Sequence, residues 1–283
     1  MAWTNYHSHT SFSDGKGTPE EFLEAAIAQN AFQYGFSDHA PVDFECVWCI
    51  PKDQLAVYYE KVDALKISYQ DKIMVYKSLE IDYIPDEITP SDFSKDLDYC
   101  VGSVHFGQKL ADGTYWVIDG PCNEFDLGVN EFYDGNVQKA VEQYFALNQK
   151  MLLEDPPNIL GHFDKIKMHN KYRFYFSEDD AWYKDCIMQT LEIAKKQNVI
   201  VEINTRGRYK KIADYYPSQW VWKEMKNLDI PIVINSDCHH PKEITKEFGL
   251  VAEELLTIGF KELMVFENGQ FVPKPFDVNG ILI

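Results

Sequence analysis

The sequence predicts a single α/β domain over residues 1–283, built as a closed or nearly closed barrel of seven parallel strands. Short apolar runs alternate with longer amphipathic stretches, which is typical of βα units around a parallel sheet. The length of 283 residues is sufficient for such a barrel, which usually takes about 250 residues. No internal repeat, low-complexity tract or Pro/Gly-rich linker divides the chain. An open doubly wound sheet is the alternative architecture.

The candidate strands are bounded by polar or turn-forming residues. Residues 199–203 and 230–234 are near-continuous apolar runs, as expected for parallel strands that helices cover on both faces. The seven predicted strands are Thr4–His7, Gln33–Ser37, Met74–Ile81, Tyr99–Val104, Asn158–His162, Val199–Asn204 and Ile230–Ser236.

Helix start signals occur between these strands. Thr18 reads as an N-cap followed by Pro19 and an acidic first turn, and Ser177 is followed by a similar acidic run. The predicted helices span residues 18–29, 52–69, 130–152, 177–197, 218–227 and 246–258. Residues 106–129 carry turn signals and aromatic residues, and we expect them to form a loop or hairpin over the functional end of the sheet.

Composition limits the class of partner. A net charge of −18 argues against nucleic acid or an anionic membrane, because both require a basic surface. We see neither a secretory leader nor an apolar run of 18 residues, so a cytoplasmic protein is expected. Among the six cysteines, Cys46 and Cys49 form a lone CxxC. A redox role is an alternative there, but reduced cytosolic thiols are the favoured interpretation.

Histidines gather at the ends of the predicted strands. His7 and His9 are two residues apart in extended chain, so their side chains point to the same face. Six of the eight histidines occupy strand ends: His7, His9, His39, His105, His162 and His239. In a parallel barrel these ends share one rim, where active sites are built. His169 and His240 fall outside the pattern and are interpreted as non-ligands.

Three carboxylates join the histidines. Glu80 lies in an apolar strand where an unpaired charge would be costly, Asp237 ends another strand, and Asp14 lies in the first βα loop. One strand-end histidine is usually a hydrogen-bonded surface residue, but the conjunction favours a metal cluster. Nine nitrogen and oxygen ligands suit two or three divalent ions such as Zn, Mn or Fe.

The expected chemistry is hydrolysis of a phosphate ester. Two ions about 4 Å apart can share a water, lower its pKa and clamp the oxygens of a phosphoryl group. Only three arginines occur, and Arg206 and Arg208 stand together after a buried strand, where guanidinium forks could bind phosphate. A structural salt bridge is the alternative for either arginine. No Gly-rich phosphate loop with a lysine is present, so nucleotide-dependent phosphoryl transfer is not expected.

The ordered motifs resemble those of the PHP (polymerase and histidinol phosphatase) family. They are His7-Ser8-His9-Thr10, Ser13-Asp14-Gly15, Ser37-Asp38-His39, Glu80, Ser103-Val104-His105, Gly161-His162 and Ser236-Asp237-Cys238-His239. The resemblance implies a distorted (β/α)7 barrel of TIM-like type and a site for three metal ions. It implies that His7, His9, Glu80 and Asp237 hold the first ion, that Glu80 bridges to a second ion held by His105 and His162, and that Asp14, His39 and His239 hold the third.

Within that family, the stretch around Arg206 and Arg208 and the later Tyr216-Pro217-Ser218 resemble the monofunctional histidinol-phosphate phosphatases of histidine biosynthesis. The implied reaction converts L-histidinol phosphate and water to L-histidinol and phosphate, through a hydroxide bridging the metals. Glu80, Asp237, Arg206 and Arg208 are the implied catalytic residues, and the two arginines the implied substrate contacts. Either a metal-bound water or Asp237 would protonate the leaving group.

Further carboxylates are expected to contact a ligand or the substrate. Asp164 could orient His162, and Asp43 or Glu45 could read the ammonium group of the substrate, although each could equally be a solvated loop carboxylate. Three other functions are compatible with the same residues: a PHP phosphoesterase for a phosphotyrosine peptide, nucleotide or other small phosphomonoester; a non-catalytic metal-stabilised module; or a metal-dependent amide or lactone hydrolase. A small phosphorylated substrate is the expected partner, and the sequence does not fix an oligomeric state.

Overall fold

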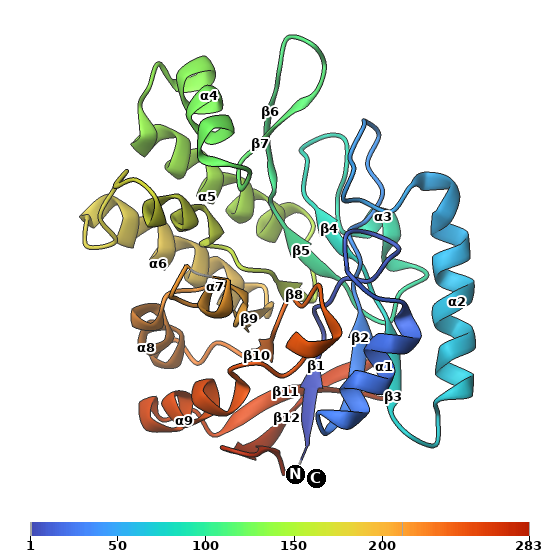
Figure 1. Cartoon of the computed structure of the whole chain (residues 1–283). Helices are drawn as coiled ribbons and strands as arrows, with labels where there is room; N and C mark the ends of the chain where they lie inside the picture. Colours follow the sequence, from blue (N-terminus) through green and yellow to red (C-terminus); the bar gives the residue numbers. More distant parts are fainter. Residues whose placement is uncertain (1, 211, 283) are drawn as a thin grey trace.

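The computed structural model describes residues 2–210 and 212–282 (Figure 1). Its centre is formed by two parallel sheets. The first has the order β1–β2–β3, with β1 at Trp3–Asn5, β2 at Ala31–Phe36 and β3 at Met74–Lys77. The second has the order β4–β5–β8–β9–β10, with β4 at Glu80–Asp82, β5 at Val101–Ser103, β8 at Ile159–Leu160, β9 at Ile200–Asn204 and β10 at Ile232–Asn235.

Isolated parallel bridges join the two sheets at both seams. His39 bridges to Glu80 beside β4, and Ser8 bridges to Cys238 beyond β10. The predicted strand Met74–Ile81 is interrupted between β3 and β4, and this break carries the chain from one sheet to the other. All seven predicted strand regions are therefore present, and the fold is the barrel-like α/β fold that the sequence predicts.

An apolar cluster fills the space between the strands. It consists of Tyr6, Tyr99, Val101, Ile159, Ile200, Val233 and Phe266. Phe266 comes from β11 (Glu262–Glu267), which forms an antiparallel sheet with β12 (Gln270–Asp277) and β13 (Gly280–Ile281). The backbone of Phe266 accepts hydrogen bonds from Gln33 and Tyr76 and donates one to Tyr6. This unpredicted sheet covers the barrel at the end opposite the β6–β7 hairpin (Figure 1).

Helices surround the sheets. They are α1 (Pro19–Ala28), η1 (Lys52–Gln54), α2 (Leu55–Ser68), α3 (Ser91–Ser94), α4 (Cys122–Tyr133), α5 (Val137–Glu154), η2 (Lys165–Lys171), α6 (Ala181–Lys196), α7 (Arg206–Tyr209), α8 (Gln219–Asn227), η3 (Pro241–Glu243) and α9 (Phe248–Ile258). Thr18 caps α1 as predicted, in a reciprocal capping box with Glu21. None of the described helices is both long and apolar enough to span a membrane.

Two helix predictions need correction. The predicted helix 130–152 is divided into α4 and α5, because Asp134 and Gly135 adopt positive φ angles of 52° and 77° that end a right-handed helix. The helix predicted to start near Ser177 begins at Ala181, with Asp180 as its N-cap. The segment 106–129 contains the expected hairpin, β6 (Phe106–Lys109) with β7 (Tyr115–Val117), but its last residues already belong to α4.

Candidate metal centre

All nine ligands predicted from the sequence meet at one rim of the barrel. His7 and His9 follow β1, His39 follows β2, Glu80 opens β4, His105 follows β5, His162 follows β8, Asp237 and His239 follow β10, and Asp14 lies in the β1–α1 loop. The carboxyl ends of parallel strands lie on one side of a sheet, so consecutive βα units bring these distant segments together. Seven of the nine are buried, and Asp14 and His239 are partly exposed.

Glu80 lies at the centre of this group. Its Oε2 lies 3.2 Å from His7 Nε2, 3.3 Å from His9 Nε2 and 3.2 Å from His39 Nδ1, and its Oε1 lies 2.9 Å from His162 Nε2 and 3.5 Å from His105 Nε2. Burial raises the pKa of the Glu80 carboxyl, but the charges of the surrounding histidines outweigh burial and hold this pKa well below its usual range. Glu80 is therefore an ionised carboxylate with both oxygens aimed at imidazoles.

Asp237 and Asp14 extend the group on either side of His9. Asp237 Oδ1 lies 3.1 Å from His9 Nε2, and Asp14 Oδ2 lies 3.1 Å from His239 Nε2. Ligand atoms that all lie within 4.8 Å of one another define four overlapping groups. They are His9, Asp14, His39 and His239; His7, Glu80 and His162; His7, His9 and Asp237; and His39, Asp82 and His105. This overlap suits several closely spaced ions.

Many of these ligand atoms lack a hydrogen-bond partner among the described residues. They are His7 Nε2, both ring nitrogens of His9 and of His162, Asp14 Oδ1, His39 Nδ1, Glu80 Oε2 and His105 Nε2. Buried polar atoms without partners are costly, and their concentration at one place calls for a ligand. For ligands about 2.1 Å from a tetrahedral ion, neighbouring ligand atoms are about 3.4 Å apart. The separations around Glu80 match that spacing, so the residues fit divalent metal ions.

Two further carboxylates contact the imidazoles of predicted ligands. Glu202 Oε2 lies 2.8 Å from His7 Nδ1, and Asp82 Oδ1 lies 3.0 Å from His105 Nδ1. Burial raises the pKa of Glu202, but the charges of His7 and His162 and the hydrogen bonds from His7 and Asn204 together outweigh burial, so this pKa is lowered overall. Such pairs fix the tautomer that leaves the other ring nitrogen free to ligate. Sequence reasoning missed Glu202, although a carboxylate inside the apolar strand β9 is the same signal that identified Glu80.

The predicted contact between Asp164 and His162 is wrong. Asp164 Oδ2 instead accepts a hydrogen bond of 2.9 Å from the Ser218 backbone N–H and lies 3.1 Å from Lys167 Nζ. Within the described residues, His162 Nδ1 has no hydrogen-bond partner. Asp164 therefore connects the β8 end to the start of α8 and does not orient a ligand.

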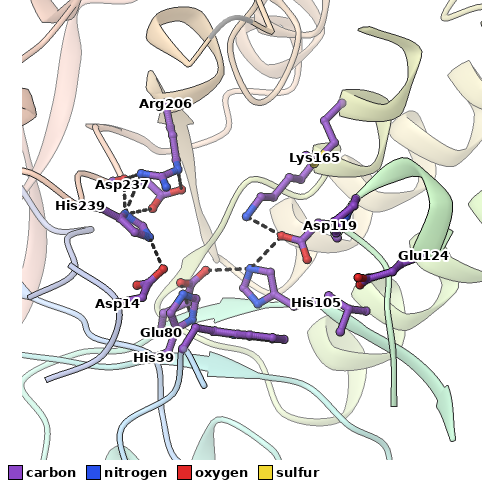
Figure 2. A pocket seen from close by; sticks show the side chains of 15 residues that line it. Asp14, His39, Glu80, His105, Asp119, Glu124, Lys165, Arg206, Asp237 and His239 are labelled. Carbon is purple, nitrogen blue, oxygen red and sulfur yellow. Dashed lines mark hydrogen bonds and ion pairs between the residues drawn. The ribbon is translucent and has the colours of Figure 1, made fainter. Parts of the chain in front are cut away.

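A cavity of about 400 Å³ opens above the predicted ligands (Figure 2). Its lining includes Asp14, His39, Glu80, His105, Asp237 and His239 from the predicted ligand set, together with Trp48, Asp119, Glu124, Lys165 and Arg206. Arg206 Nη1 donates to the Asp237 backbone oxygen at 2.7 Å and lies 2.7 Å from His239 Nδ1. Arg206 thus places a cation directly beside the predicted ligands.

Arg208 does not share this position. Its Nη1 donates to the Ala213 backbone oxygen at 3.0 Å, its Nε lies 4.0 Å from Glu247 Oε2, and it is absent from the cavity lining. The two arginines lie two residues apart on α7, and residues at that spacing point away from each other on a helix. The prediction that both arginines face the site is therefore wrong for Arg208.

The second cation of the cavity is Lys165, which sequence reasoning missed. Its Nζ lies 2.8 Å from Asp119 Oδ2, and the same oxygen lies 4.0 Å from His105 Nε2 (Figure 2). Burial raises the pKa of Asp119, but Lys165 and His105 outweigh it and hold this pKa below its usual range. Lys165 follows His162 by three residues, and Asp119 lies in a loop, so neither had a strand-end signal.

Asp43 and Glu45 do not face the cavity above the ligands. Both line a separate surface cavity, and Asp43 pairs with Lys52 there. The prediction that one of them faces the substrate is therefore wrong for this arrangement of the loop. Asp119 and Glu124, in contrast, both line the cavity above the predicted ligands.

The chain is similar to known proteins over most of its length. Residues 5–206 match the PHP domain. A probable histidinol-phosphatase of Deinococcus radiodurans is 26% identical over an alignment of 261 residues, and the match covers 89% of this chain and 92% of that protein. A histidinol-phosphatase of Bacillus subtilis is 24% identical over an alignment of 257 residues, and the match covers 84% of this chain and 94% of that protein.

Two solved structures share the fold. The putative histidinol phosphatase HisK of Listeria monocytogenes has a TM-score of 0.76 at 20% identity, covering 87% of this chain and 99% of that chain. HisK of Lactococcus lactis, solved in complex with Zn, L-histidinol and phosphate, has a TM-score of 0.72 at 19% identity, covering 95% of this chain and 98% of that chain. Because the PHP domain match spans well over half of the sequence, this chain belongs to the PHP family.

Proposed function

We propose that this protein hydrolyses L-histidinol phosphate to L-histidinol and phosphate, a step of histidine biosynthesis. The observation that carries the proposal is the cluster of nine ligands beneath a cavity containing two cations, Arg206 and Lys165. The names of the curated relatives and the zinc, histidinol and phosphate bound by the Lactococcus lactis protein support the choice of substrate.

We propose three divalent ions, Zn, Mn or Fe, in this site. His7, His9, Glu80 and Asp237 would hold the first, Glu80, His105 and His162 the second, and Asp14, His39 and His239 the third. The unpartnered buried atoms of these side chains support the proposal. When bound, such ions supply Lewis acidity to a phosphoryl group and bring the pKa of a water toward neutrality.

The residues of the chain would bind and orient the phosphate. Arg206 is anchored by the Asp237 backbone oxygen and keeps donors for phosphoryl oxygens. Lys165, which pairs with Asp119, would approach the phosphate from the side of His105. These two cations would bind the substrate's dianion and stabilise negative charge that develops during phosphoryl transfer. Asp237, beside Arg206, would relay a proton from the attacking water to the leaving alkoxide.

The cavity would select a small cationic alcohol as leaving group. Its volume of about 400 Å³ suits a metabolite better than a peptide. Asp119 and Glu124 line the part of the cavity away from Asp14 and His239 (Figure 2). Histidinol carries an ammonium group and an imidazole, so a carboxylate there would favour it over neutral alcohols. Another small phosphomonoester with a cationic alcohol is the second candidate, because its charges would fit the same contacts.

The test is phosphate release by metal-replete protein from L-histidinol phosphate, an aryl phosphate, other phosphorylated metabolites and a lactone. We expect kcat/KM for histidinol phosphate to exceed that for the aryl phosphate by at least about 100-fold. Glu124→Gln should reduce this ratio while leaving aryl phosphate hydrolysis near wild type. Hydrolysis of the aryl ester without preference for histidinol phosphate would overturn the substrate, and lactone hydrolysis alone would overturn the reaction class.

A further inference from the structure

Cys46 and Cys49 lie in the loop that follows His39, outside the predicted metal cluster. The two ends of this loop are fixed: Ala40 N–H donates to the Glu80 backbone oxygen at 2.8 Å, and Ile50 N–H donates to the His39 backbone oxygen at 3.0 Å. Residues 41–49 form a loop that leaves the rim of the barrel and returns to it. The far end of the loop is therefore hydrogen-bonded directly to the His39 backbone.

Cys46 and Cys49 are three residues apart in this loop and line the same surface cavity. The Cys49 thiol donates a hydrogen bond to Cys46, which lowers the pKa of Cys46 against the opposing effect of burial. The same hydrogen bond, followed by burial, raises the pKa of Cys49. Cys46 is partly exposed and Cys49 is buried. Burial also raises the pKa of the Cys100, Cys186 and Cys238 thiols to about 11, so these thiols are weaker nucleophiles at neutral pH.

A reagent can reach this pair without entering the cavity above the metal ligands. Both cysteines line a separate surface cavity of about 370 Å³, which has room for a small thiol or disulfide. The lining of the catalytic cavity includes neither cysteine. A reagent can therefore reach the two cysteines through the surface cavity, which is separate from the cavity above the predicted ligands.

Trp48 connects the pair to the catalytic cavity. It lies between the two cysteines in the sequence and lines that cavity. Its ring stacks on Phe106, with centroids 5.4 Å apart and planes inclined by 14°, and Phe106 directly follows His105. Any covalent closure of the Cys46–Cys49 turn changes the backbone that carries Trp48. The loop therefore links a dithiol to the backbone of His39 and the neighbour of His105.

We propose that Cys46 and Cys49 form a reversible oxidation site, at which small disulfides convert the dithiol to an intramolecular disulfide that moves Trp48 and lowers activity. The Cys46 thiolate attacks a small disulfide, forms a mixed disulfide and releases one thiolate. Cys49, after losing its proton, attacks the Cys46 sulfur and releases the second thiolate. Two protein thiols are oxidised and one small disulfide is reduced to two thiols, so electrons and atoms balance.

The experiment uses the full-length, metal-loaded protein equilibrated with defined mixtures of reduced and oxidised glutathione. Peptide mapping by mass spectrometry should locate a Cys46–Cys49 disulfide, formed before any other cysteine is modified. Over the same range of mixtures, kcat/KM should fall by roughly tenfold or more, because small displacements in a site have large kinetic effects. Metal content should stay constant, and dithiothreitol should restore activity.

Matched variants separate this site from general thiol oxidation. Cys46→Ser and Cys49→Ala should each keep the reduced protein's activity and lose its response to oxidised glutathione. Cys186→Ser, which changes a cysteine on α6, should remain as sensitive as wild type. Failure of the 46–49 disulfide to form, or its formation with unchanged kcat/KM, would overturn the proposal. Because disulfide mapping does not require a known substrate, the oxidation site is testable even if the proposed substrate is wrong.

Discussion

His7 and Glu202 form a fully buried hydrogen bond of 2.8 Å between Nδ1 and Oε2. Glu202 also accepts from the His162 backbone N–H at 2.9 Å and from the amide groups of Asn204 and Asn235. All of these neighbours donate hydrogen bonds to the carboxylate oxygens. Replacing the carboxylate by an amide would therefore point the NH2 group of the amide at another hydrogen-bond donor. Glu202 thus holds the His7 tautomer whose Nε2 faces Glu80.

Glu202→Gln should weaken metal binding by roughly 10- to 100-fold, the usual cost of losing a carboxylate that orients a histidine ligand. The measurement is metal content per chain after dialysis against a graded series of chelator concentrations. Glu192→Gln, on the exposed face of α6, is the matched control and should bind metal like wild type. Unchanged metal retention in Glu202→Gln would show that His7 is oriented by other contacts.

Glu80→Ala should abolish turnover, with a loss of more than about a thousandfold in kcat, because it removes the carboxylate shared by five imidazoles. Metal content should fall in the same variant. Glu80→Gln keeps the shape of the side chain without its charge and should show the same loss if the charge is what matters. Activity that survives complete removal of metal would contradict the whole assignment of the site.

Arg206→Ala and Arg208→Ala should behave differently, although the sequence treats them alike. Arg206 lines the catalytic cavity, so its loss should lower kcat/KM for phosphate esters by about 10²–10³-fold with near-normal metal content. Arg208 contacts Ala213 and Glu247 outside the cavity and serves as the matched control, with kcat/KM within about threefold of wild type. The measurement is kcat/KM of both variants at saturating metal. Equal losses would show that Arg208 swings into the site.

The meeting of the nine predicted ligands at one place could be predicted from sequence because eight of them follow or open a buried strand, and the geometry of parallel strands gathers strand ends at one rim. Lys165 and Asp119 have no such local signal. Their pairing at 2.8 Å depends on how η2 and the loop after β7 pack over the rim, which is a property of tertiary structure. Arg208 was misplaced because the helical turn α7 was not predicted, and an extended segment would have put both arginines on one face.

The missed elements of the fold also have physical causes. Pro273 and Pro275 occur in β12, and prolines lack the N–H that a ladder requires, so the segment did not resemble a strand. The break between α4 and α5 falls at Asp134-Gly135, a turn signal inside an otherwise helical stretch. Glu202, in contrast, could have been predicted from the sequence as a buried carboxylate, because its neighbours in the strand are apolar.

His169 lies outside the metal cluster and allows a test of pH-dependent stability. Its ring stacks on Phe125 with centroids 4.0 Å apart, and its Nε2 donates to the Ile118 backbone oxygen at 2.7 Å. Burial lowers the pKa of His169 below its ordinary value of 6.5, against the opposing effect of the Ile118 hydrogen bond. Below pH 6.5 the unfolded chain therefore binds more protons at this residue than the folded chain does.

The contribution of His169 to the free energy of unfolding should be fully present above pH 6.5 and should decrease as pH falls from 6.5 toward the lowered pKa of the folded state. His169→Gln keeps an N–H donor for Ile118 and removes the titration. The difference in unfolding free energy between wild type and this variant, measured by urea denaturation from pH 8 to pH 5, should therefore shift in favour of the variant as pH falls. One proton limits the slope to about 1.4 kcal/mol per pH unit. A difference that stays constant across this range would mean that the folded protein accepts a proton on His169 as readily as the unfolded chain does.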